Sequence, residues 1–206
     1  MQVRAWAAAH DINSAQFGTL NSYTISMMAL YHMQTLEESQ TPALVELFKH
    51  EGTLPVEIDA QTCSAESVKQ ACSEVAECER DEESKASLAQ LFLGFLQHYD
   101  ALLSAWDCGL PLRVCPRTAT LRHDPFDREF PVLVEDPFDT SSNTAAAVAD
   151  KGAVCVRRAF LDGAALASGA MQSRLMGRKT IDAFVEQLFE TSRRAPSFER
   201  WRRRRP

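Results

Sequence analysis

The chain has 206 residues, of which 45% are hydrophobic and 24% charged, and its formal net charge is −6. This composition supplies one well-buried domain with a small appendage. The apolar runs are too short to span a membrane, and no charged-then-apolar signal pattern opens the chain. The six cysteines show no C-x-x-C spacing and no paired His cluster, so we interpret them as reduced thiols of an intracellular protein.

The charge is unevenly distributed along the chain. Residues 193–206 hold seven Arg and one Glu, which leaves 15 basic and 27 acidic residues in 1–192, a net charge of −12. A chain that binds nucleic acid over its whole surface would have a net positive charge in residues 1–192 instead. The Arg-rich tail is predicted to be an arm for RNA phosphates or an acidic partner, a nuclear address, or a solubilising tail.

Residues 1–23 contain a first helix, a turn and the start of a second helix. Residues 1–9 have helical composition, and a Met that opens directly into a helix suggests that an N-terminal part is missing; a frayed terminal helix is the alternative. Gly18 allows a turn with positive φ, and Thr19, Asn21 or Ser22 can cap the helix that follows. That helix is predicted over about 22–36, with one apolar face formed by Ile25, Met28, Ala29, Met33 and Leu36.

Ser22 and Tyr23 lie at the predicted N-terminus of this helix. Backbone N–H groups and the helix dipole favour a phosphate there. A Ser hydroxyl can donate to the same anion, and a Tyr ring can stack on a base. The alternative is a capping Ser and a packed Tyr.

The middle of the chain predicts further helices and two short strands. A short helix is expected over 41–48, then a charged, acidic insert over about 50–84. The clearest helix runs over 85–104, with an unbroken apolar stripe whose aromatic residues we assign to packing. His98 beside it is interpreted as a satisfied core or rim residue. Short strands are expected at 112–115 and 119–121, and the Asp-Pro-Phe-Asp of 124–127 is interpreted as a coincidental turn.

Residues 130–148 predict a strand, a loop and a helix. Val132 to Val134 are apolar and mostly β-branched, and Pro137 ends the strand because it has no N–H. The loop 136–142 would present Asp136 and Asp139 as acceptors to a planar ligand edge with N–H donors. Asn143 or Thr144 would cap a helix starting at Ala145. A structural strand, loop and helix with surface acids is the alternative. Helices are also predicted over 151–168 and 180–193.

Two stretches resemble one protein family. The first stretch is Val-Arg-Ala-Trp-Ala-Ala-Ala-His-Asp-Ile-Asn of 3–13, followed by Gly-Thr-Leu-Asn-Ser-Tyr of 18–23. The second is Val-Glu-Asp-Pro-Phe-Asp of 134–139, followed by Asn143. Both resemble nucleotide-recognition motifs of the non-canonical poly(A)/poly(U) polymerases, and they occur in the order of that family. The similarity is greatest to plant-type terminal RNA uridylyltransferases. It implies a mainly α fold with a few short β-strands (α+β), comprising the central and PAP-associated domain over 1–192 and the tail over 193–206.

The resemblance assigns nucleotide-binding roles to five residues. It places Ser22 at the γ-phosphate and Tyr23 in a stack on uracil, with Asp136 and Asp139 as the acids of the recognition loop. Arg4 matches one of the family's two basic residues near the phosphates. The bound nucleotide would be UTP or ATP, and the further partner would be an RNA 3′ end.

The sequence also departs from the family at four positions. Ala8 stands at the position of a phosphate-binding Lys, and Asp139 at that of a Glu one methylene longer. Ser142 occupies a position that often carries a His favouring uracil, and Ala146 that of an Arg. Lost cations weaken both affinity for a triphosphate and its charge neutralisation.

The catalytic residues of the family have no counterpart in this chain. The family's two metal ions, Mg²⁺ or Mn²⁺, are held by three carboxylates, two of them in a D-x-D shortly after a Gly-Ser turn. This sequence contains no such arrangement, so we expect no catalytic or metal-binding residues here and no activity of this chain alone. We expect a cytoplasmic or nuclear protein without membrane contact, which could bind a protein through its tail. The alternatives to an enzyme portion are a non-catalytic RNA- or protein-binding relative and a purely structural helical domain.

Overall fold

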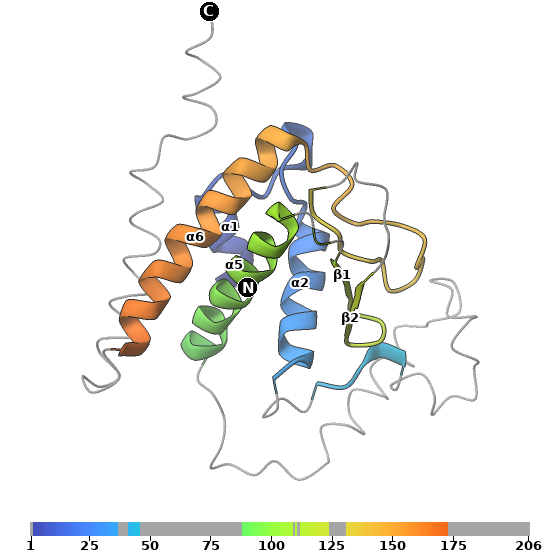
Figure 1. Cartoon of the computed structure of the whole chain (residues 1–206), viewed down its shortest axis with the longest axis horizontal. Helices are drawn as coiled ribbons and strands as arrows, with labels where there is room; N and C mark the ends of the chain where they lie inside the picture. The colour runs from blue at the N-terminus through green and yellow to red at the C-terminus, as the bar shows by residue number, and fades with distance from the viewer. Residues whose placement is uncertain are drawn as a thin grey trace, which may run out of the picture.

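The computed structural model describes residues 2–36, 41–45, 88–108, 110, 112–123 and 131–172. In these residues the fold is mainly α with one two-stranded antiparallel sheet, as the sequence predicted (Figure 1). The elements are α1 (Gln2–Ala9), the 3-10 helix η1 (Ala15–Phe17), α2 (Ser22–Gln34), α5 (Leu88–Asp107), β1 (Leu112–Cys115), β2 (Thr120–His123) and α6 (Asp150–Gln172).

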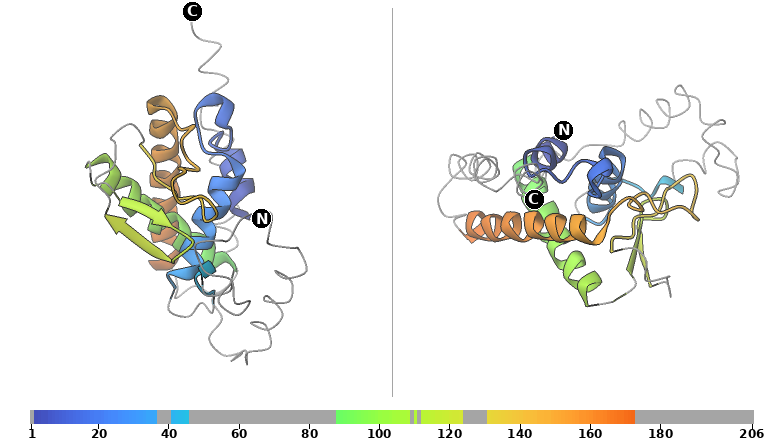
Figure 2. Two further views of the ribbon diagram at one scale, coloured as in Figure 1. Left: turned by 90° about the vertical axis from the view of Figure 1, so that its right-hand side faces the viewer. Right: turned by 90° about the horizontal axis from the view of Figure 1, so that it is seen from above.

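The two longest helices, α5 and α6, lie side by side (Figures 1 and 2). The apolar stripe predicted for α5 is buried from Phe92 to Leu103, although Leu88 at its start is exposed. Gly163 of α6 allows that helix to approach the side chain of Leu96. Arg157 of α6 adds polar contacts at the edge, with Asp100 at 2.9 Å and Asp107 at 2.6 Å. α1 packs against both helices through Trp6, and α2 and β1 contact α5.

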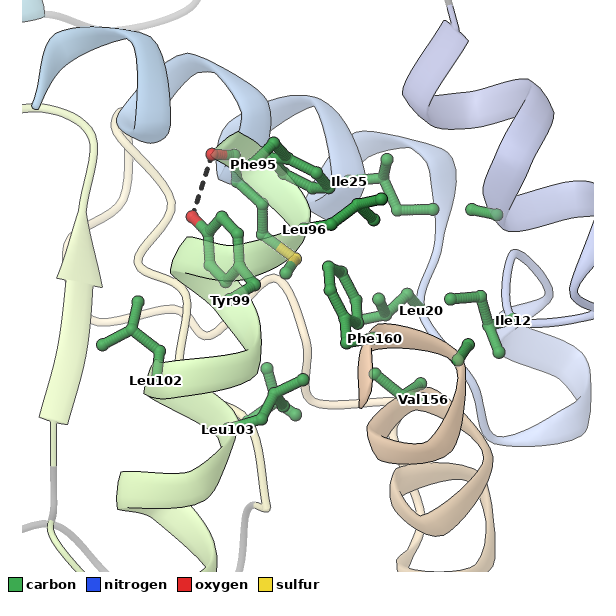
Figure 3. Close-up of a cluster of buried hydrophobic side chains, with 14 of the residues drawn as sticks. Ile12, Leu20, Ile25, Phe95, Leu96, Tyr99, Leu102, Leu103, Val156 and Phe160 are labelled. Atoms are coloured by element: carbon green, nitrogen blue, oxygen red, sulfur yellow. Dashed lines mark hydrogen bonds between the residues drawn. The ribbon is translucent and has the colours of Figure 1, made fainter. Parts of the chain in front are cut away.

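The hydrophobic core lies between α1, α2, α5 and α6. Trp6 of α1 packs edge-on against Phe160 of α6. Tyr99 of α5 is fully buried, and its hydroxyl donates to Met28 O of α2 at 2.8 Å (Figure 3). The buried apolar side chains drawn around them include Ile12, Leu20, Ile25, Phe95, Leu96, Leu102, Leu103 and Val156. Burial of this apolar surface is the main source of stability for the four helices.

Two histidines lie together where α2 packs on α5. The rings of His32 and His98 have centroids 5.2 Å apart, and Tyr31 and Tyr99 pack against His98. His98 therefore belongs to the packed core, as expected, but the expectation that it is satisfied is wrong. Its Nε2 is buried without a hydrogen-bond partner among the described residues, and both ring nitrogens of His32 share that state.

A small sheet borders α2. β1 and β2 pair antiparallel with Leu112 opposite His123 and Cys115 opposite Thr120. The segment predicted as a strand at 132–134 is extended and buried, but it forms only a single parallel bridge to β1, between Val134 and Val114. It therefore lies against β1 without becoming a full third strand.

Several predicted boundaries are wrong. The helix expected from Ala145 begins at Asp150, because Asn143 caps a turn instead: its side-chain oxygen accepts from the N–H groups of Val134 and Ala145. β2 begins at Thr120, since Ala119 has φ 51° and belongs to the turn. α2 ends at Gln34 and α5 continues to Asp107.

Other predictions fall partly or wholly outside the described residues. These are the helix over 41–48 beyond residue 45, the acidic insert over 50–84, the Asp-Pro-Phe-Asp turn of 124–127, the helix over 180–193 and the tail over 193–206. Among the helices that the structure describes, none is long and apolar enough to cross a membrane.

Candidate functional site

The N-terminus of α2 is joined to the segment after Val134 by hydrogen bonds of its capping residue and of its first turn. Asn21 has extended backbone geometry, and its Oδ1 accepts from Thr24 N at 2.7 Å, as an N-cap should. Its Nδ2 also donates to Thr144 O at 2.9 Å, and the Thr24 hydroxyl donates to the same carbonyl at 2.6 Å. The cap therefore holds two segments together that lie over a hundred residues apart in the sequence.

This junction brings Tyr23 and Asp136 into contact. The Tyr23 hydroxyl donates to Asp136 Oδ1 at 3.3 Å across a sequence separation of 113 residues. The same oxygen accepts from the backbone N–H groups of Phe138 at 2.9 Å and Asp139 at 3.4 Å. Oδ2 accepts no hydrogen bond from the described residues, so it is the acceptor left for a ligand N–H.

Tyr23 keeps its proton in this environment. Its partial burial, together with the charge of Asp136 and the hydrogen bond to it, raises the pKa of Tyr23 to about 12. The phenol therefore stays a neutral donor to Asp136 at physiological pH. The side chain is still 39% exposed, so a planar ligand can reach the ring.

Ser22 and Arg4 are linked at the same helix end through Ser26. Arg4 donates to the Ser26 hydroxyl from Nε at 3.1 Å and from Nη2 at 2.8 Å, and that hydroxyl donates to Ser22 O at 2.8 Å. Ser22 is exposed, and its own hydroxyl donates to Asn13 Oδ1 at 3.1 Å. The guanidinium thus lies one helical turn from the exposed Ser22, and helix N-termini favour anions.

The first turn of α2 also supplies backbone donors. The first N–H groups of a helix have no partner within the helix. Here the side chain and the carbonyl of Asn21 take those of Thr24 and Ile25. Within the described part of the chain, the N–H groups of Ser22 and Tyr23 remain unpaired, which suits an anion such as phosphate.

Asp139, the second predicted acid, makes its hydrogen bonds within its own loop. Its Oδ1 accepts from the Ser141 hydroxyl at 2.6 Å and from Ser141 N at 3.1 Å. These bonds lower the pKa of Asp139, which is fully exposed and stays ionised. The structure therefore joins Tyr23 to Asp136, keeps Asp139 on the same loop, and leaves the Asp139 carboxylate facing its own backbone.

Three of the family departures map to exposed positions. Ala8 is an exposed methyl on α1, and Ser142 and Ala146 are exposed in the segment that leads to α6. Small, uncharged side chains occupy these three positions, so none of them adds a cation to the site. Among the five predicted site residues, Arg4 is the one basic residue. Among the described residues no group of three or more His, Cys, Asp and Glu side chains could hold a metal ion. The described residues therefore contain no such group for Mg²⁺ or Mn²⁺.

Sequence reasoning missed the residues beneath the loop. Glu135, adjacent to Asp136, is 1% exposed, and Arg113 of β1 is 9% exposed. Glu135 extends the apolar run of the segment before it, and Arg113 stands between apolar residues of an expected strand, which hinted at burial of both. No pattern in a single sequence could show that they meet, since that depends on the bridge between Val114 and Val134.

Comparison with solved structures identifies the class of fold. A structure titled as a cytoplasmic RNA terminal U-transferase aligns with a TM-score of 0.56 at 20% identity, covering 91% of this chain and 55% of that one. The Cid1 poly(U) polymerase, in a structure described as revealing its UTP selectivity, aligns with a TM-score of 0.55 at 21% identity over 80% of this chain and 49% of that one. The fold of this chain is therefore similar to that of the matched parts of these two structures.

Curated relatives narrow the class to a family. Poly(A) RNA polymerase GLD2 of Mus musculus is 32% identical over 152 residues, which cover 72% of this chain. Protein HESO1 of Arabidopsis thaliana is 24% identical over 199 residues, 92% of this chain. No family model matches the chain. The chain belongs to the non-canonical poly(A)/poly(U) polymerase family. It spans 28% of the length of mouse GLD2 and 38% of that of HESO1.

Proposed function

We propose that this chain is the part of a terminal RNA nucleotidyltransferase that binds the incoming nucleoside triphosphate, UTP or ATP, for addition to an RNA 3′ end. The observation that carries the proposal is the hydrogen bond between Tyr23 and Asp136, because it joins the two stretches that resemble the family's recognition motifs. Their contact sits at a helix N-terminus with unpaired donors, which suits a ligand with a base at one end and phosphates at the other.

The three parts of the ligand would contact different groups. The exposed face of Tyr23 stacks on the base, and Asp136 Oδ2 accepts a hydrogen bond from its N–H edge. Ser22 and Arg4, with the first N–H groups of α2, bind the phosphates. The metal ions and the carboxylates that hold them belong to a catalytic part outside this sequence, so the chain alone binds the nucleotide without transferring it.

Calorimetric titration of the chain with UTP, ATP and inorganic tripolyphosphate tests the proposal. Asp136→Asn keeps an oxygen for Tyr23 and for Phe138 N but replaces the free acceptor with an amide donor, so nucleotide affinity should fall about tenfold or more while tripolyphosphate affinity stays the same. Tyr23→Ala removes the stack, which is worth about 1–3 kcal/mol per base, and should have a similar effect.

Asp162→Asn is the matched control for these variants. Asp162 is an exposed carboxylate on α6 whose ion pair is with Arg158, so its loss should leave all three affinities unchanged. Binding of neither UTP nor ATP by the wild-type chain would overturn the proposal. RNA binding by such a chain would instead support the alternative of a non-catalytic RNA-binding relative.

A further inference from the structure

A buried carboxylate lies directly beneath the recognition loop. The side chain of Glu135 is 0% exposed, and its Oε2 lies 3.5 Å from Arg113 Nη1 and 3.8 Å from Arg122 Nη1. The thiol of Cys115 also donates to Oε2, at 3.4 Å. A carboxylate removed from water is costly unless cations and donors surround it. Glu135 therefore depends on its two arginines, of which only Arg113 is buried with it.

Arg113 contacts the loop at both ends. The nitrogen that approaches Glu135, the residue before Asp136, also donates to Thr140 O, the residue after Asp139, at 3.0 Å. One guanidinium nitrogen thus joins the two flanks of the four-residue segment that carries both acids. Arg122 reaches Glu135 from the exposed strand β2, and its described ion pair does not extend to the loop.

We propose that Arg113 is a positioning residue for recognition of the nucleobase, which fixes the loop of residues 136–140 so that the Asp136 carboxylate stands at Tyr23. The inference rests on the proposed function, and it adds Arg113, which lies in neither motif, to the residues that serve nucleotide binding. An acceptor displaced by about 1 Å loses most of its discrimination. Arg113 should therefore control how strongly the base contributes to binding.

The phosphate end of the site offers an internal reference. Arg4 and Ser22 lie on α1 and α2, and their hydrogen bonds run through Ser26 and Asn13 without involving the loop. A defect confined to the loop would leave inorganic tripolyphosphate binding unchanged. A general loss of structure would weaken both ends together, so the two causes can be separated.

The test compares the wild-type chain with the double variant Arg113→Met/Glu135→Gln. Removing both charges avoids leaving an unpaired carboxylate in the interior, which a single substitution would do. Affinity for the better bound of UTP and ATP should fall about tenfold, as expected for a displaced charged acceptor, while tripolyphosphate affinity stays within about twofold. Equal losses for nucleotide and tripolyphosphate, or no loss at all, would overturn the inference.

Two further variants separate positioning from charge. Arg122→Met removes the exposed cation next to Glu135 and should leave nucleotide affinity unchanged, because Arg122 has no described bond to the loop. Arg113→Lys keeps one cationic nitrogen, and the contacts of Arg113 with Glu135 and with Thr140 O come from one nitrogen. This conservative variant should therefore lose less affinity than the double variant, and it remains testable if the double variant does not fold.

A readout without nucleotide distinguishes failure of this inference from failure of the proposed function. At neutral pH the NMR chemical shift of the Tyr23 phenol carbon reports its hydrogen bond to Asp136. In the double variant this shift should move toward its value in Asp136→Ala, and in Arg122→Met it should stay at the wild-type value. A wild-type chain that binds no nucleotide would refute the proposed function alone. An unmoved Tyr23 shift in the folded double variant would refute the positioning role of Arg113.

Discussion

Two interfaces hold the described part of the chain together, and they are built from opposite kinds of contact. The apolar interface joins α5 to α6 and α2 through side chains such as Leu96, Tyr99 and Phe160. The polar interface joins the N-terminus of α2, with the turn before it, to residues 131–149. Its contacts are hydrogen bonds: Asn21 and Thr24 to Thr144 O, Tyr23 to Asp136, and Ala149 N to Gly18 O.

The difference matters for function because the two kinds of contact have different directionality. Apolar burial is roughly proportional to area and tolerates small shifts of one helix on another. Hydrogen bonds hold their partners at defined distances and angles. The candidate site lies at the polar interface, where acceptors and donors must be placed accurately, while the apolar interface supplies most of the stability. Variants that act on one interface at a time can test this division.

Gly152→Ala should have the largest effect, because it acts on the backbone of the polar interface. A Cβ on Gly152 of α6 would lie 1.7 Å from Gly18 O and 2.5 Å from Gly18 C. Both atoms are backbone, so α6 or the turn at Gly18 must move. We expect the free energy of unfolding to fall by about 3 kcal/mol, although Ala favours a helix by about 0.5–1 kcal/mol over Gly. Urea unfolding measures the change.

Gly163→Ala is the control on the same helix. The three atoms nearest to its Cβ would all belong to the side chain of Leu96, at 3.2, 3.3 and 3.6 Å, and this flexible side chain of the apolar interface can adjust. We expect a change within about 1 kcal/mol of the wild type. A Gly152→Ala variant as stable as Gly163→Ala would show that the contact between Gly18 and α6 is not close in solution.

The apolar interface could be predicted from the sequence in part, since helical periodicity indicates which face is buried. The stripe on α5 is buried from Phe92 to Leu103, but Leu88 at its start is 64% exposed. On α2, Ile25 and Met28 of the predicted face are buried, whereas Met33 is exposed and Tyr31 and His32 are buried instead.

The helix expected from Ala145 was wrong for a reason that lies in the polar interface. Asn143 can cap a helix or a turn. Here its side-chain oxygen accepts a hydrogen bond from Val134 N, which favours the turn.

The candidate site could be predicted only in part. Tyr23 and Asp136 could be singled out because both lie in motifs, and the structure brings them into contact. Their nucleotide-binding roles, like those of Ser22, Asp139 and Arg4, stay predictions. Arg113 carried no motif, and its contacts follow from the way β1 lies against the segment before the loop. Contacts that depend on such tertiary pairing cannot be read from residue spacing.

The second largest effect should come from acid, which should lower the free energy of unfolding through His32 and His98 of the apolar interface. Burial, helped by the neighbouring His98, lowers the pKa of His32 to about 4, and burial also lowers that of His98. The unfolded chain takes up these protons near pH 6.5, so stability is full above about pH 6.5 and falls as the pH decreases toward 4. At about pH 5.5, His32 alone should cost about 1.4 kcal/mol, with a further loss from His98.

Urea unfolding at about pH 7 and pH 5.5 measures this loss. The variant His32→Gln/His98→Gln removes both titrating groups, so its stability should change less between the two pH values than that of the wild type. His123→Gln, at an exposed position on β2, should keep the wild-type pH dependence. If the double variant and the wild type lose the same free energy, the histidine pair is not buried as described.

The smallest effect concerns a single bond of the polar interface, between Tyr23 and Asp136. Because the pKa of Tyr23 is raised to about 12, its neutral form is stabilised: stability is unaffected below about pH 10 and falls as the pH rises from 10 toward 12. The chain has three Tyr, so the difference in tyrosinate absorbance between the wild type and Tyr23→Phe isolates this residue.

Asp136→Asn should lower the titration midpoint of Tyr23 without returning it to 10. Burial is the largest cause of the raised pKa and persists in the variant, whereas the charge of Asp136 is removed. Asp139→Asn is the control, because its carboxylate bonds only to Ser141 among the described contacts and should leave the midpoint unchanged. Equal midpoints in the wild type and Asp136→Asn would mean that the two motifs do not meet in solution. In that case the polar interface would consist of the bonds of Asn21 and Thr24 to Thr144 O and of Ala149 N to Gly18 O, and the placement of an acceptor beside the tyrosine ring would have no support.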